Sequence, residues 1–241
     1  MLASYQQPPA PQPAPSTAAL GSANAKALLD RVIAAKGGLD TLHAIKSITA
    51  VTSAEMTSPA GRIEARTTTY LEYPNHVRVE TTLPEATTVQ VYDGEHAWIR
   101  DPKGVHDVPE RMVQDLQTGL KRETVALLLG AASGELHARV LPDVKDAAGR
   151  LDHALEVSGP GLEPVVLYIA PDTNLISRQT YVAGGPGQPI IEEAFSDYRA
   201  VDGVRVAYTA AVRRGGEPIL ERRVRDIKIN APIDPALFKR P

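Results

Sequence analysis

The chain contains no cysteine, and it has only two phenylalanines and one tryptophan among its 241 residues. The absence of cysteine excludes disulfides, thiolate metal sites and a cysteine nucleophile, but it fits both reducing and oxidising compartments. Because aromatic side chains are scarce while valine, isoleucine, leucine and alanine are abundant, we expect an aliphatic interior. No stretch approaches the ~20 apolar residues of a transmembrane helix, and the N-terminus lacks the basic and apolar regions of a secretory signal.

The sequence also lacks an excess of charge of either sign. Its 26 basic and 29 acidic residues give a formal net charge of −3. A protein that binds nucleic acid or an anionic membrane surface through charge needs a basic patch or stripe. We therefore expect no nucleic-acid partner.

The N-terminal residues differ in composition from the rest of the chain. Residues 1–23 contain the run PPAPQPAP and almost no large apolar side chain, so we predict a disordered tether or linker there. Asn24 is a suitable N-cap for a first helix that ends at Gly37, and Asp40 for a short second helix. Residues 24–241 are predicted to form one domain.

Most of the domain carries apolar residues at every second position, which is typical of half-buried strands. The longest such pattern is a hairpin from Val204 to Ile229 that turns at Gly215 and Gly216. We count about ten or eleven strands and predict a mainly β (α+β) fold with a broad, curved antiparallel sheet. A sheet of this size needs other elements to cover its inner face.

One helical block interrupts the strands. Pro109 suits the first turn of a helix with an apolar stripe of Met112, Val113, Leu116 and Leu120. The next run, Thr124 to Leu129, is apolar on all sides, which indicates a short helix buried in the mouth of the curved sheet. Near the C-terminus, Leu237 and Phe238 are expected to form a closing plug.

The sequence carries none of the motifs of hydrolases, metalloproteases or nucleotide-binding proteins. His96 and His106 could join Asp93 or Glu95 as metal ligands, but solvated histidines explain the same residues. We therefore predict no catalytic residue, no metal and no cofactor. An esterase-like or metal-dependent enzyme stays as an alternative, because a fold does not exclude a site placed on it.

Four stretches, in their order along the chain, resemble the LolA/LolB-like lipoprotein-sorting superfamily of bacteria. They are AKALLDRVIAAKGGLDTLHAIKSI, YDGEHAWIRDPKG, the leucine run from Arg122 to Gly130, and SDYRAVDGVRVAYTAAVRRGG with the later INAPIDPALF. The chain is also similar to LolA-like domains at the C-terminal end of some bacterial insulinase-type (M16) zinc peptidases. A proline-rich linker such as residues 6–15 would suit a joint to such a peptidase.

The resemblance implies an open antiparallel β half-barrel whose helices cover an apolar concave face, located in the periplasm. It implies non-catalytic binding of lipid or lipoprotein acyl chains. The alternative is a structural or interaction module associated with an M16-type zinc peptidase. A zinc peptidase domain is thus a second expected partner beside the acyl chains.

We can name candidate ligand-binding residues for this fold. Leu127 and Leu128 are predicted to lie in the lid, and the expected concave positions are Leu71, Val79, Val91, Leu167 and Val206. Trp98 and Tyr208 complete the candidates, although packing in the core explains each of these two aromatic side chains as well.

Overall fold

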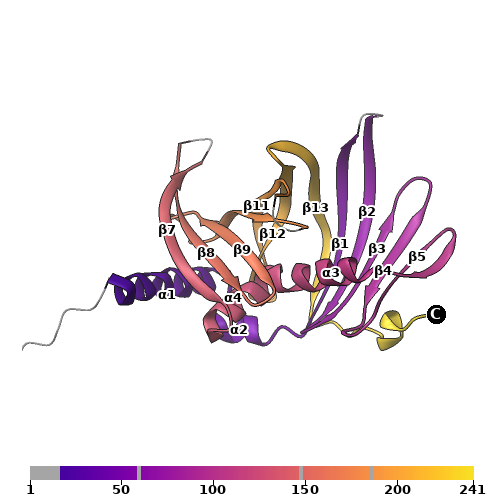
Figure 1. Ribbon diagram of the computed structural model, residues 1–241, viewed down its shortest axis with the longest axis horizontal. Coiled ribbons are helices and arrows are strands. Elements are labelled where there is room, and N and C mark those ends of the chain that lie inside the picture. Colours follow the sequence, from indigo (N-terminus) through magenta and orange to yellow (C-terminus); the bar gives the residue numbers. More distant parts are fainter. Residues whose placement is uncertain (1–16, 59–60, 147–148, 185–186) are drawn as a thin grey trace, which may run out of the picture.

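The computed structural model describes residues 17–58, 61–146, 149–184 and 187–241 (Figure 1). Residues 1–16 of the expected tether lie outside these ranges. Helix α1 spans Thr17–Lys36, so the expectation that the helix begins with Asn24 as its N-cap is wrong. Alanine and leucine between positions 18 and 27 are strong helix formers, which explains an earlier start. The helix does end at Gly37, where φ is 142° and a Cβ would come within 2.5 Å of the Gly203 carbonyl oxygen.

The described strands form one open antiparallel sheet of thirteen strands, in the order β6-β5-β4-β3-β2-β1-β13-β12-β11-β10-β9-β8-β7. They are β1 (Ser47–Ser58), β2 (Gly61–Glu72), β3 (His76–Thr82), β4 (Thr87–Tyr92), β5 (Ala97–Asp101), β6 (Gly104–Asp107), β7 (His137–Lys145), β8 (Leu151–Gly159), β9 (Leu162–Ile169), β10 (Ile176–Val182), β11 (Ile190–Val201), β12 (Val204–Arg214) and β13 (Glu217–Ile229). The predicted mainly β, open and curved sheet is confirmed, but the count of ten or eleven strands is too low. The short β6, paired with β5 across the turn at Asp101 and Gly104, has too few residues to show a period of two.

The sheet consists of two meanders joined in its middle. β1 pairs with β13, with Ile48 opposite Ile229, so the first and last strands of the chain lie side by side. β6 and β7 are consecutive strands but form the two outer edges of the sheet. The helices between them, α3 (Glu110–Arg122) and α4 (Thr124–Ser133), therefore span the space between the two halves (Figure 1).

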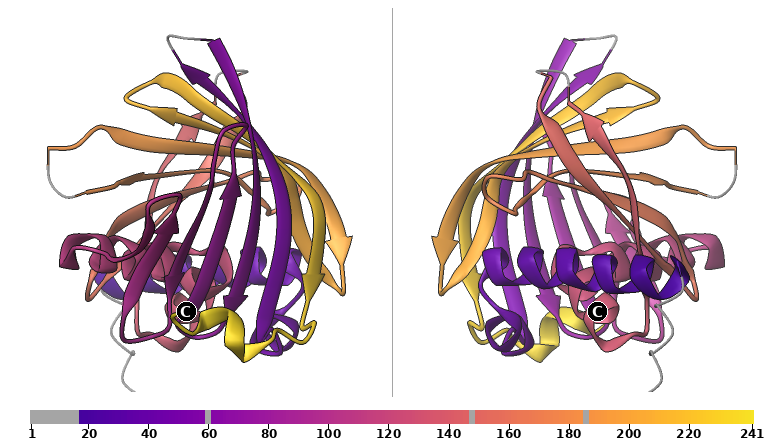
Figure 2. Two further views of the ribbon diagram at one scale, coloured as in Figure 1. Left: turned by 90° about the vertical axis from the view of Figure 1, so that its right-hand side faces the viewer. Right: turned by 90° about the vertical axis from the view of Figure 1, so that its left-hand side faces the viewer.

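The helices gather at one end of the strands, and the β1–β2 and β12–β13 hairpins extend away from them (Figure 2). Helix α2 (Leu39–His43) has Gly38 as its N-cap, so the predicted cap at Asp40 is wrong by two positions. Helix α3 follows Pro109, as predicted. The last element is a short 3-10 helix, η1 (Pro235–Phe238).

Most of the hydrophobic core lies between the helices and β8, β9 and β12. Its members come from one face of α1, from α2 and α4, and from the inner faces of these strands. A second cluster packs the apolar stripe of α3, through Val113, Leu116 and Leu120, against Leu71, Val77, Tyr92 and Ala97 of β2 to β5. Met112, predicted in the same stripe, is among the exposed large hydrophobic residues.

A third cluster lies on the other face of β4 and β5. There, Val89, Val91 and Trp98 pack against Phe238 of η1. Val91 pairs with Arg78, whose guanidinium donates to the Leu237 carbonyl oxygen at 2.8 Å, whereas the adjacent Tyr92 packs toward α3. The expected concave position of Val91 is therefore wrong, and Trp98, opposite Val91 in the ladder, shares its face. The predicted plug of Leu237 and Phe238 is the cover of this outer face.

Candidate functional site

Two adjoining cavities lie beside α3, and Gln117 and Lys121 line both of them. The smaller, of about 720 Å³, lies between α3, α4 and the turns after β2 and β8, with Pro74, Leu120, Ala126 and Leu136 in its wall. The larger, of about 1000 Å³, lies between α3 and the ends of β8 to β13, with Leu162, Val182, Ile191 and Ile219 in its wall. Both volumes fall in or near the range of ~300–1,000 Å³ typical of small-molecule sites.

Helix α3 crosses the sheet as a strap held by a few polar contacts. Lys121 donates from Nζ to the Pro160 carbonyl oxygen at 2.9 Å, and Arg111 donates to the Gly184 carbonyl oxygen at 3.3 Å. On the other side, Gln117 donates from Nε2 to the Tyr92 hydroxyl at 2.8 Å. No residue of α3 is fully buried. The strap is thus fastened to β4 in one half of the sheet and to two turns in the other, but it is not part of the deep core.

Helix α4 is anchored far more firmly. Leu127 and Leu128 are 0% exposed, and Val125 and Gly130 are also buried. Its N-terminus is capped by Glu123, whose Oε2 accepts hydrogen bonds from the Val125 and Ala126 amides. The predicted burial of this leucine run is confirmed.

The α3–α4 junction also carries a buried polar group. The Tyr73 hydroxyl donates to Glu123 Oε2, so one carboxylate oxygen serves both the helix cap and the end of β2. Burial, and then the Glu123 charge, raise the pKa of the Tyr73 phenol well above its usual value. Burial also lowers the pKa of Lys36, although the Glu123 charge acts in the opposite direction.

Arg122, the last residue of α3, lines the larger cavity and belongs to a set of polar contacts. The Arg122 guanidinium lies 3.8 Å from the centre of the Tyr181 ring. The Tyr181 hydroxyl donates to Glu193 at 2.7 Å, and Arg222 lies 3.8 Å from the other oxygen of the same carboxylate. Burial, followed by the Glu193 charge, raises the pKa of Tyr181. The raised pKa keeps the tyrosine neutral beside the Arg122 guanidinium.

The nine predicted ligand-binding residues occupy four places. Leu71 and Val79 belong to the cluster under α3, and Leu127, Leu128, Leu167 and Val206 belong to the main core. Val91 and Trp98 lie on the outer face, and the Tyr208 ring is half-buried under the Arg199 guanidinium at 4.2 Å. None of the nine is among the lining residues of the two cavities. Their contact with a ligand stays a prediction.

The lining residues that the sequence reasoning missed come mainly from the polar face of α3. Arg111, Gln117, Lys121 and Arg122 lie there, next to the predicted apolar stripe. The available signal was the spacing of the lining residues Arg111, Gln114, Thr118 and Lys121 at three to four positions on one helix, which places them on a common face. Only the position of α3 across the sheet makes that face part of a cavity wall.

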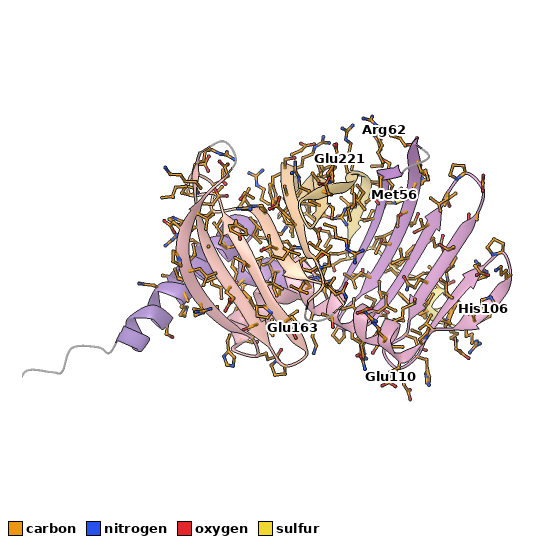
Figure 3. The ribbon with its side chains drawn as sticks, turned by 45° about the horizontal axis from the view of Figure 1, so that its top comes forward. Met56, Arg62, His106, Glu110, Glu163 and Glu221 are labelled. Carbon is orange, nitrogen blue, oxygen red and sulfur yellow. The ribbon has the colours of Figure 1, made fainter. Side chains whose placement is uncertain are left out.

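Metal-ligating residues do not gather within the part of the chain that the structure describes. No group of three or more His, Asp or Glu side chains in it could hold a metal ion. His106 lies 3.3 Å from Asp101, and His96 lies 4.0 Å from Glu95. Figure 3 shows His106 at the outer edge of the sheet, on the half opposite Glu163. Likewise, no helix in the described ranges is long and apolar enough to cross a membrane.

No protein-family model matches the sequence, and no curated protein matches it. Solved structures do resemble the chain. A DUF1329 family protein from Desulfovibrio piger has a TM-score of 0.61 at 14% identity and covers 89% of this chain and 97% of its own. A LolA superfamily protein from Nitrosomonas europaea has a TM-score of 0.60 at 12% identity, with 90% and 97% covered.

A third structure, from Vibrio parahaemolyticus, is a domain named for outer-membrane lipoprotein sorting. Its TM-score is 0.57 at 12% identity, and 89% of this chain and 97% of that domain are covered. None of these three proteins is named as a peptidase, so the expected link to M16 peptidases stays a prediction. The thirteen-stranded open sheet, the helices that cross it and these full-length similarities show that the chain has a LolA/LolB-like fold.

Proposed function

We propose that the protein binds the acyl chains of a lipid or lipoprotein in the two cavities beside α3, without catalysis, in the periplasm. The observation that carries the proposal is the pair of adjoining cavities, of about 720 and 1000 Å³, between one helix and the inner side of an open sheet. One of the similar structures is named for outer-membrane lipoprotein sorting, which supports the same ligand class.

The energy of such binding would come from apolar burial. Each methylene removed from water contributes ~0.8 kcal/mol, so ten methylenes contribute about 8 kcal/mol before the costs of association. Side chains such as Leu120, Leu136 and Ile191 give the cavity walls the apolar surface that this burial needs. The gain is large enough to offset the ordering of a flexible chain.

Entry of a long chain requires part of the cover to move, and α3 is the better candidate than α4. The strap is held by three hydrogen bonds and by half-buried side chains, whereas α4 inserts fully buried leucines into the main core. A neutral hydrogen bond contributes only about 0.5–1.5 kcal/mol net, and one from a charged donor about 1.5–3 kcal/mol. Movement of α3 would therefore cost less than removal of α4.

The chemistry of the walls supports binding rather than reaction. Among the described residues, the lining of the two cavities includes no His, Ser or Cys, the side chains that most often act as bases or nucleophiles. The acidic residues that line it are Glu135 in the smaller cavity and Asp115 and Glu163 in the larger one.

Uptake of a fluorescent fatty acid, together with native mass spectrometry of protein from a bacterial host, tests the proposal. Ala126→Trp places a large ring in the smaller cavity and should reduce uptake, whereas the same change at the exposed, non-lining Ala211 should leave it unchanged. Protein that carries no lipid and takes up no probe would contradict the proposal. Equal uptake by both tryptophan variants would place the ligand elsewhere.

A further inference from the structure

The larger cavity is more basic than the whole chain would suggest. Arg111, Lys121, Arg122 and Arg214 line it, against the two acidic residues Asp115 and Glu163. The chain as a whole has a net charge of −3. Arg122 is half-buried, and a half-buried guanidinium attracts an anion more strongly than an exposed one, because less water screens its charge.

Two of the four basic residues already have partners. Lys121 and Arg111 donate to backbone carbonyl oxygens and thereby hold the strap in place. Arg122 and Arg214 form no ion pair with any residue that the structure describes. The nearby carboxylate, Glu193, already accepts hydrogen bonds from Tyr181 and Gln179 and lies close to Arg222. Two guanidinium groups of this cavity thus keep donors available.

The position of Arg122 is suited to recognition. The Arg122 guanidinium lies over the Tyr181 ring at 3.8 Å, a cation–π contact that uses none of its N–H donors. A planar guanidinium binds carboxylate and phosphate oxygens with two parallel hydrogen bonds. A lysine would not offer the same planar geometry.

We infer that the larger cavity binds the anionic head group of the ligand through Arg122 and Arg214. The acyl chain then passes beside Gln117 and Lys121 toward the smaller cavity, whose wall is richer in apolar residues. This inference rests on the proposed function and adds the head-group chemistry, an acidic carboxylate or phosphate group attached to the chain. A fatty acid and an anionic phospholipid share that chemistry.

Matched probes that differ only in head-group charge test the inference. A pyrene-labelled fatty acid is compared with its methyl ester, and lysophosphatidylglycerol is compared with lysophosphatidylcholine as a competitor. The native protein should prefer the anionic member by about tenfold, the effect of one or two charge-assisted contacts. The double variant Arg122→Gln and Arg214→Gln should lose most of this preference. For each pair, the ratio of the affinity for the anionic member to that for the neutral or zwitterionic member is measured. A larger ratio for the fatty-acid pair identifies a carboxylate head group, and a larger ratio for the phospholipid pair identifies a phosphate.

The control is Arg205→Gln, because Arg205 is an exposed arginine of the same strand that does not line the cavity. Its preference should equal that of the native protein. If the double variant fails to fold, the single variant Arg214→Gln is measured instead, because an exposed side chain can be replaced without loss of folding. This variant should lower the preference for the anionic probe severalfold.

The two proposals fail in different ways. No uptake of either probe by the native protein would overturn the proposed function. Equal affinity for charged and neutral probes, or a preference that survives the loss of Arg122 and Arg214, would overturn the head-group inference and leave acyl-chain binding intact.

Discussion

The substitution Leu128→Asp should destabilise the protein severely. Leu128 is 0% exposed in the cluster that joins α1 and α4 to the inner face of the sheet. Truncation of a buried leucine costs about 2–5 kcal/mol, and an unpaired buried carboxylate adds several kcal/mol. The sum reaches a large part of the 5–15 kcal/mol that stabilises typical domains. We expect a Tm lower by more than about 10 °C or no cooperative unfolding at all.

Thermal unfolding followed by circular dichroism, together with uptake of a fluorescent fatty acid, measures the effect. Leu128→Met keeps the side-chain volume and should cost less than about 1.5 kcal/mol. Leu39→Asp introduces the same charge at a site that is 43% exposed and should change Tm little. If Leu128→Asp kept both the native Tm and the native uptake, Leu128 would lie on the outside, and the role of α4 as fixed cover would be refuted.

Three further predictions follow from the two helices and their junction. In hydrogen exchange followed by mass spectrometry, the amides of α3 should exchange faster than those of α4, and slower exchange in α3 would contradict its role as a movable strap. Glu123→Ala removes the α4 cap and the acceptor for Tyr73, so denaturant titration should show a loss of about 1–3 kcal/mol; no loss would mean that the cap is not formed. The pKa of Tyr73 in the folded protein lies above its unfolded value of ~10, so the stabilisation that the protonated phenol provides is lost as pH rises above ~10. Tyr73→Phe has no phenol to titrate, and its Tm should therefore fall less steeply above pH ~10 than the Tm of the native protein.

Local sequence patterns predicted most of the strands but not their order in the sheet. The Gly215–Gly216 turn predicted the β12–β13 hairpin because glycine tolerates the positive φ that both residues adopt. The pairing of β1 with β13 joins segments from opposite ends of the domain, and no local pattern encodes such a contact. Helices over the concave face were predicted, but their path from one edge of the sheet to the other follows from this pairing and was not.

The faces of β4 and β5 illustrate a second limit. The alternation of side chains along a strand separates its two faces, but the sequence shows which face is the inner one only where the outer face is polar. Here both faces are apolar, because η1 covers Val91 and Trp98 while α3 covers Tyr92 and Ala97. The sequence predicted that Leu237 and Phe238 form a plug, but it did not show which strands the plug covers. Val91 was therefore assigned to the wrong face.

The candidate site escaped prediction for a related reason. Apolar periodicity finds residues that pack, and it correctly found Leu127 and Leu128 in the core. The wall of the larger cavity is mixed, with Arg122 and Arg214 beside Leu162 and Ile191. In a sequence, such basic residues resemble any solvated helix face or strand end.

The connection from β6 to β7 links the fold to the proposed function. These consecutive strands form opposite edges of one antiparallel sheet, so the chain between them has to cross the concave side. A crossover that was apolar throughout would fill the mouth and leave no space for a ligand. Here the crossover consists of two different helices. Helix α4 is embedded in the core. Helix α3 has no fully buried residue and is attached to both halves of the sheet by polar contacts. In the proposed function, this one segment would provide both a fixed wall, α4, and a movable cover, α3.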